Sequence, residues 1–129
     1  MSDTVEELKQ MCQSLVDRLE QFEDKMLYDT ESGDMVFISS LPDDYDEDRY
    51  IDLERYLEDN YGVKLIVDLP DKHLYGAEIC MAWGGPNIYI ETRDSYVRGY
   101  WGCDTVQVPL RYSVSETIND IVDEWMEIY

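Results

Sequence analysis

The most constraining feature of this chain is the uneven distribution of its acidic residues. The sequence carries 30 acids against 10 bases, a formal net charge of −20. Residues 61–112, whose pattern predicts strands, hold six acids and five bases. Residues 1–40, 41–60 and 113–129, which are mainly helical by pattern, hold the other acids with only five bases. Because the charge is confined to certain elements, it indicates a surface built for a positively charged partner.

Length and composition bound the class of protein. A chain of 129 residues is one domain of ordinary size, and a hydrophobic fraction of 44% is too high for a disordered acidic tail. No apolar run approaches the ~20 residues of a membrane span, and the N-terminus lacks the features of a secretory signal. Cys12, Cys80 and Cys103 are far apart, as is typical of reduced, buried thiols. We expect one acidic domain over residues 1–129, in the cytoplasm and without membrane association.

An amphipathic helix is expected at the N-terminus. Thr4 and Glu7 form a capping-box pattern, in which each side chain satisfies a free backbone N–H. The apolar residues that follow recur at a/d heptad spacing: Val5, Leu8, Cys12, Leu15, Leu19, Phe22 and Met26. Such a stripe packs on a sheet of its own domain or pairs with a second copy of the chain. The first arrangement is favoured because the chain has strands to cover, so we expect a monomer, with a dimer as the alternative.

Two short elements and a second helix follow. Residues 30–34 predict a turn, and residues 35–38 are either a short strand or a buried connector. The second helix is expected from Asp48 to Asn60, with Gly62 placed to end it, because glycine tolerates the left-handed conformation.

The remaining pattern predicts strands and a final helix. Strands are expected at residues 63–69, 74–83, 87–92 and 96–101, with a shorter piece at 105–108. Short loops between them, including a turn at Pro70–His73, favour an antiparallel meander. Ser113 and Glu116 repeat the capping-box pattern before a helix with an apolar face made of Val114, Ile118, Ile121, Val122, Trp125 and Ile128. The fold class is therefore α+β, an antiparallel β-meander of about four strands covered by N-terminal, central and C-terminal helices.

No catalytic constellation can be assembled from the sequence. His73 is the only histidine, and Gly84-Gly85 is followed by Pro86 rather than by a phosphate-binding helix. The nearest approach to a metal site is an EF-hand-like run of Asp44, Asp46, Asp48 and Asp52 at loop positions one, three, five and nine. Arg49 and Arg55 occupy positions six and twelve, which require glycine and a bidentate glutamate. We expect no enzyme, no cofactor and no dedicated metal site.

The informative constellation is the acidic one. Direct nucleic-acid binding is disfavoured, because a phosphate backbone requires a basic footprint that this chain lacks. Carboxylates three or four residues apart on a helix lie ~5–6 Å from one another, close to the spacing of phosphates along a strand. The candidate partner-binding residues are Asp43, Asp44, Asp46, Glu47, Asp48, Asp52, Glu54, Glu58, Asp59, Glu116, Asp120, Asp123, Glu124 and Glu127. Tyr50 and Tyr56 either add aromatic contacts or belong to the core.

Two short motifs carry a family resemblance. Gly84-Gly85-Pro86-Asn87 within residues 80–92, and Gly99-Tyr100-Trp101-Gly102 within residues 97–104, resemble a module in small acidic proteins of phages, plasmids and integrative elements of gut Firmicutes. The resemblance covers about residues 50–129 and leaves the first helix unmatched. It implies a mobile-element setting in a bacterial host, where such proteins often act as anti-CRISPR or anti-restriction inhibitors. It transfers no catalytic residue.

The leading hypothesis is a non-enzymatic inhibitor that mimics nucleic acid and binds a basic, nucleic-acid-binding defence protein. A second hypothesis is an assembly protein that dimerises through the first helix, its acids serving solubility alone. A third is an antitoxin-like or chaperone-like partner of one basic protein. An enzyme comes last. An acidic surface that is merely solvated is the plain alternative to all of them.

Overall fold

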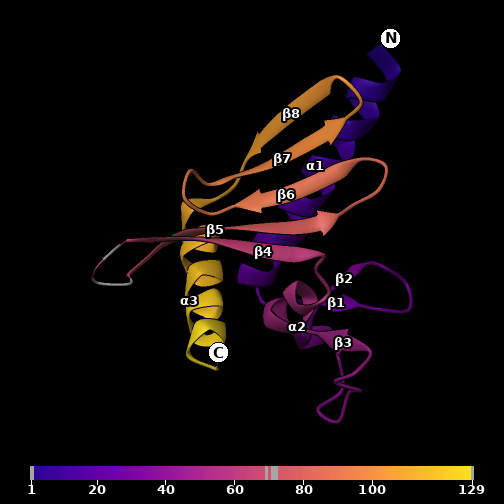
Figure 1. Ribbon diagram of the computed structural model, residues 1–129. Coiled ribbons are helices and arrows are strands. Elements are labelled where there is room, and N and C mark those ends of the chain that lie inside the picture. Colours follow the sequence, from indigo (N-terminus) through magenta and orange to yellow (C-terminus); the bar gives the residue numbers. More distant parts are fainter. Residues whose placement is uncertain (1, 69, 71–72, 129) are drawn as a thin grey trace.

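The computed structural model describes residues 2–68, 70 and 73–128. Two antiparallel sheets and three α-helices make an α+β fold, as predicted (Figure 1). The helices and the 3-10 turn are α1 (Ser2–Glu23), η1 (Ile38–Ser40), α2 (Leu53–Glu58) and α3 (Tyr112–Ile128). The strands are β1 (Met26–Asp29), β2 (Met35–Phe37), β3 (Tyr50–Ile51), β4 (Gly62–Asp68), β5 (His73–Ala82), β6 (Asn87–Glu91), β7 (Tyr96–Trp101) and β8 (Asp104–Pro109). Within the described residues, no helix combines the length and apolar character needed to cross a membrane.

The larger sheet is the predicted meander, with strand order β4-β5-β6-β7-β8. It has five strands rather than about four, because residues 104–109 form a full strand paired along β7. Cross-strand neighbours such as Ile79 with Ile90, and Ile90 with Val97, place buried aliphatic side chains on one face. Of the predicted turn at Pro70–His73, residues 71–72 lie outside the described residues, and His73 begins β5.

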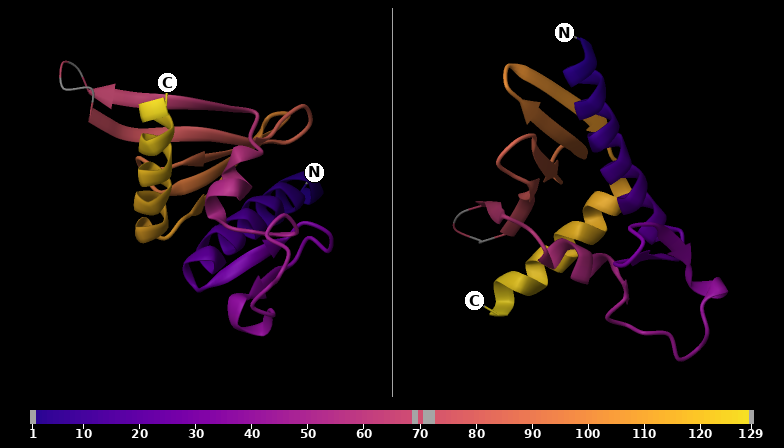
Figure 2. Two further views of the ribbon diagram at one scale, coloured as in Figure 1. Left: turned by 90° about the horizontal axis from the view of Figure 1, so that it is seen from below. Right: turned by 90° about the vertical axis from the view of Figure 1, so that its right-hand side faces the viewer.

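The apolar stripe of α1 covers that aliphatic face (Figures 1 and 2). Leu8, Cys12 and Leu19 are fully buried. Gly99 of β7 lets the helix approach closely, since a Cβ there would lie 2.6 Å from Cys12 Sγ and 2.7 Å from Leu8 Cδ1. The stripe is thus occupied within the chain's own core and is not free to form a seam with a second copy. Oligomeric state itself remains a prediction.

Details of α1 and of the cysteines differ from the expectation. The helix already includes Ser2, so Thr4 lies inside its first turn and cannot cap it. Met26 belongs to β1 instead of the helix, because the chain leaves α1 at Glu23. Cys103 is exposed rather than buried, since it lies in the turn between β7 and β8.

The final helix, α3, covers the same face of the sheet next to α1. Val114, Ile118 and Val122 are buried, while the Ile128 side chain lies outside the described residues. The predicted cap at Ser113 is wrong, because α3 begins at Tyr112 and Ser113 lies inside its first turn, where Val114 N and Ser115 N donate to Arg111 O. Hydrogen bonds from Thr92 Oγ1 to Asn119 Oδ1 (2.6 Å) and between the Ser95 and Ser115 hydroxyls (2.7 Å) attach the helix to the sheet.

A small second sheet replaces part of the predicted second helix. Tyr50 and Ile51 pair with β1 as strand β3, and α2 therefore begins only at Leu53. The cap of α2 is Asp52, whose Oδ1 accepts a hydrogen bond from Arg55 N at 3.0 Å. Gly62 opens β4 instead of terminating the helix, which ends at Glu58 with Asp59 as its C-cap. Residues 35–38 resolve as strand β2 followed by η1.

Candidate partner-binding surface

The predicted acidic residues lie on two segments, residues 43–59 around α2 and residues 116–127 of α3. The loop of residues 41–49, α2 and the C-terminal half of α3 all reach the lower part of Figure 1, and Figure 2 shows α2 between the loop on one side and α3 on the other. The N-terminal half of α1 and the β7–β8 hairpin lie at the opposite end. We call the fourteen carboxylates of residues 43–59 and 116–127 the acidic end. Of these, all are exposed except Glu54, which is half-buried.

The loop that carries five of these acids is held by turns of its own. Tyr45 N bonds to Pro42 O at 3.1 Å, and Tyr50 N bonds to Asp46 O at 3.0 Å. The side chain of Asp46 accepts from Asp48 N at 2.9 Å, an Asx turn that fixes the chain between two carboxylates. The acids are therefore placed by local hydrogen bonding rather than by burial.

The two arginines of this segment are already engaged. Arg55 Nη1 donates to Glu47 O at 2.7 Å and lies 3.2 Å from Asp48 Oδ1. Arg49 forms a bidentate pair with Asp29 of β1, at 3.0 and 3.1 Å, and also contacts Glu31. Arg49 thus neutralises carboxylates outside the acidic end. Most of the acidic end keeps an uncompensated negative charge.

The Asp29–Arg49 pair anchors the loop to the small sheet. Asp29 is buried, and it also accepts hydrogen bonds from the Ser32 hydroxyl (2.9 Å) and Glu31 N (3.0 Å). The Arg49 guanidinium, followed by these neighbouring donors, holds the pKa of Asp29 well below its usual range.

A second ionic cluster fixes the start of α3. Arg111 Nη1 lies 2.9 Å from Glu23 Oε1 and 3.4 Å from Asp24 Oδ1, both at the end of α1. The Ser113 hydroxyl donates to the same Glu23 oxygen at 2.9 Å. Hydrogen bonds from Arg111 and Ser113 lower the pKa of Glu23, so this pairing persists at mildly acidic pH. The cluster sets the direction in which α3 carries its acids.

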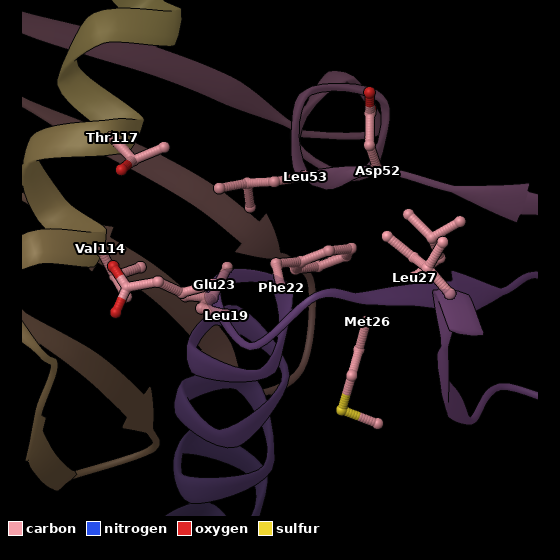
Figure 3. Close-up of a pocket in the computed structure, with 10 residues that line it drawn as sticks. Leu19, Phe22, Glu23, Met26, Leu27, Asp52, Leu53, Val114 and Thr117 are labelled. Atoms are coloured by element: carbon pink, nitrogen blue, oxygen red, sulfur yellow. The ribbon is translucent and has the colours of Figure 1, made fainter. Parts of the chain in front are cut away.

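An apolar hollow of about 250 Å³ lies between the acidic helices (Figure 3). Leu53 of α2 and Thr117 of α3 point into the same space from opposite sides, with Leu19 and Phe22 of α1 beneath. The other lining residues are the apolar Met26, Leu27, Ile38 and Val114 and the carboxylates Glu23 and Asp52. The adjacent Phe37 and Ile38 are 56% and 42% exposed. Apolar centres with charged rims are typical of protein interfaces.

Tyr50 and Tyr56, the two tyrosines considered for aromatic contacts, have different environments. Tyr56 packs against Phe22 and Tyr28, with ring centroids 5.4 and 5.0 Å away, and contributes to the core. Tyr50 is half-buried beside Tyr45 and under the Arg49 guanidinium. Neither ring is offered freely to a partner.

A further cluster, which the sequence pattern did not reveal, lies on the sheet face opposite α1 and α3. Glu78 and Glu91 are direct cross-strand neighbours, as are Tyr89 and Arg98. The Arg98 guanidinium lies over the Tyr96 ring and donates to Tyr100 Oη at 2.9 Å. The alternation of side chains along each strand predicts which residues share a face. It identifies this cluster only when the pairing register of β5, β6 and β7 is also known.

In the EF-hand-like run of aspartates, an arginine occupies a carboxylate that a cation would need. Arg55 contacts Asp48, one of the four aspartates that would have to face a cation. Among the described residues, no group of three or more His, Cys, Asp or Glu side chains is arranged to hold a metal ion.

Comparison of the chain with protein-family models, with curated proteins and with solved structures gave no match.

Proposed function

We propose that this protein is a non-enzymatic inhibitor that binds a basic, nucleic-acid-binding protein through the acidic end. The observation that carries the proposal is that thirteen of the fourteen carboxylates are exposed, on the loop of residues 41–49, on α2 and its flanks, and on α3. The two arginines of the same segment do not neutralise this charge. Arg49 pairs with Asp29, outside the acidic end, and among the described residues Arg55 pairs with Asp48 alone. Holding like charges together costs self-repulsion, which a partner's Lys and Arg side chains would relieve.

The mechanism is substitution of carboxylates for phosphates. Neighbouring acids on α3 lie ~5–6 Å apart, comparable to phosphates along one strand. Lys and Arg side chains that normally contact phosphate would pair with these carboxylates, and nucleic acid would be excluded from the same channel. No bond is made or broken, so inhibition follows occupancy.

The apolar hollow distinguishes this proposal from a surface that is only solvated. A solubility-promoting surface has no use for an apolar space between its charged helices. In a complex, one apolar side chain of the partner would enter beside Leu53 and Thr117 while the acids form the rim. Charge would then steer association, and the hollow would fix the docked orientation.

The resemblance to phage and plasmid proteins supports a specific class of target. A defence nuclease or CRISPR effector in the host cytoplasm has a basic channel and a reason to be inhibited. An antitoxin-like role toward one basic protein is the alternative, and it predicts a partner that nucleic acid does not displace.

The proposal is tested by affinity capture from a nuclease-treated bacterial lysate. We expect nucleic-acid-binding proteins to be retained at ~100 mM salt and eluted by added duplex DNA or RNA, because exposed charges compete for one basic surface. A column bearing Asp43→Lys, Asp44→Lys, Glu47→Lys should retain none of them. Retention that is equal on both columns, or elution by neither DNA nor RNA, would refute nucleic-acid mimicry.

A further inference from the structure

The uncovered face of the five-stranded sheet is hollowed near its β4 edge. A groove of about 420 Å³ is lined by Tyr61, Lys64, Glu78, Cys80, Trp83 and Tyr89. We call it the Glu78 pocket. Both long helices lie on the other face (Figure 2), so the described part of the chain does not cover this one.

Aromatic rings form the mouth of the Glu78 pocket. Tyr61 is 68% exposed and Trp83 is 65% exposed, which is unusual for rings of this size. Tyr89 is half-buried at the floor, 5.9 Å from Tyr100 between centroids. Exposed ring faces of this kind attract cations, and tryptophan does so most strongly.

The carboxyl groups beside these rings lack a sufficient counter-charge. Glu78 stands opposite Glu91 on β6, and burial followed by the neighbouring Glu91 carboxyl raises the pKa of Glu78. The Glu91 Oε2 atom is buried, lies 3.4 Å from Arg98 Nη2 and makes no hydrogen bond. Arg98 is shared with the hydroxyls of Tyr96 and Tyr100.

Lys64, on the neighbouring strand β4, does not neutralise the Glu78 carboxylate. Lys64 faces Glu78 across the β4–β5 ladder but is exposed, and it forms no ion pair in the described structure. Arg98 pairs with Glu91, and Glu78, which lines the groove beside the aromatic rings, has no ion-pair partner in the described structure.

We propose that the Glu78 pocket binds the guanidinium group of an arginine side chain supplied by a protein partner. A planar guanidinium stacks on Trp83 or Tyr61 while it donates to the Glu78 carboxylate, a combination that the rounder, more strongly hydrated ammonium of lysine matches less well. The pocket lies close to α2 along the chain, because Tyr61 belongs to the three-residue link between that helix and β4. A partner seated on the acidic end could therefore place an arginine here.

The test uses a small probe, so its outcome does not depend on whether the acidic end has a target. N-acetyl-arginine amide and its uncharged analogue N-acetyl-citrulline amide would be titrated into ¹⁵N-labelled protein. We expect the arginine probe to shift the Trp83 indole and Glu78 amide resonances saturably, and the citrulline probe to bind at least about tenfold more weakly. Equal binding of the two probes, or arginine-induced shifts confined to the acidic end, would overturn the proposal.

Two variants assign the binding to the named groups. Glu78→Gln keeps the shape of the side chain and should weaken arginine binding at least about fivefold, and Trp83→Ala should do the same from the surface. Glu124→Gln, in the acidic end, is the matched control and should bind like the wild type. Wild-type affinity in the Glu78→Gln and Trp83→Ala variants would contradict the proposal. The proposal would also be contradicted if the Trp83 and Glu78 resonances shifted with protein concentration in the absence of probe. Such shifts would indicate that two copies of the chain contact each other through the pocket.

Discussion

The covered face of the five-stranded sheet and the acidic end obey different physical rules. On the covered face, fully buried Leu8, Ile90 and Val97 hold the fold through the area they remove from water. At the acidic end, all carboxylates but Glu54 are exposed, and apart from the helix cap Asp52 each contributes little to the stability of the fold. The contrast teaches that charge can be changed at one end without unfolding the other. Each prediction below tests whether stability depends on the covered face and binding depends on the acidic end.

The largest effect is expected on the covered face. Leu8→Ala should lower the free energy of unfolding by about 2–5 kcal/mol, because it removes a buried side chain and leaves a cavity under Gly99. Chemical denaturation measures the change. Met11→Ala, on the same helix but 38% exposed, is the matched control and should change stability by less than ~0.5 kcal/mol. Equal losses in both variants would mean that α1 does not pack as described.

The next effect concerns binding rather than stability. Asp43→Lys, Asp44→Lys, Glu47→Lys should weaken binding to a captured target at least about tenfold, with an unchanged unfolding midpoint. These side chains form no hydrogen bond or ion pair in the described structure. Asp52 is left intact, because it caps α2 and its loss would cost about 1 kcal/mol.

A control with the same change in charge separates position from net charge. Glu6→Lys, Glu7→Lys, Asp104→Lys alters α1 and β8 at the opposite end of the molecule. Binding close to that of the wild type is expected. A loss as large as that of the triple variant at the acidic end would show that only net charge matters.

These predictions rest partly on what the sequence could reveal. The stripes of α1 and α3 and the alternation of β5–β7 follow from local periodicity, so the helices, the meander and the exposure of the acids were predictable. The small sheet was not, because β3 has two residues, Tyr50 and Ile51, whose pairing with β1 is long-range. The apolar hollow escaped prediction for the same reason, since it joins residues from α1, β1, α2 and α3.

The Asp29–Arg49 pair should make stability depend on pH. Because the pKa of Asp29 is lowered, its ionised form stabilises the fold above its ordinary pKa of 3.8, and that contribution is lost as the pH falls below this value. Asp29→Asn should therefore lower Tm at pH 7 and reduce the loss of Tm between about pH 4 and pH 2. Asp34→Asn, exposed in the same hairpin, should leave both unchanged. An Asp29→Asn variant with the acid profile of the wild type would disprove the assignment.

The smallest effect is expected at Glu78. Its raised pKa means that the protonated form favours folding, and this contribution is lost as the pH rises from 4.5 through the raised value. Glu78→Gln should therefore raise Tm slightly at pH 7 and have no effect at pH 4, as measured by thermal melts. Glu116→Gln, exposed on α3, serves as the control. A Tm that falls at pH 7 would show that ionised Glu78 is stabilising.

The central claim is that the acidic end takes the place of nucleic acid on a basic protein. Its most direct measurement is the Kd for a captured target between ~50 and ~300 mM salt, with and without saturating duplex DNA, because exposed charges are screened over ~8–10 Å. The account predicts that Kd rises at least about tenfold over this range and that DNA competes for the site. A Kd that ignores salt, with DNA and the protein bound to the target together, would contradict it.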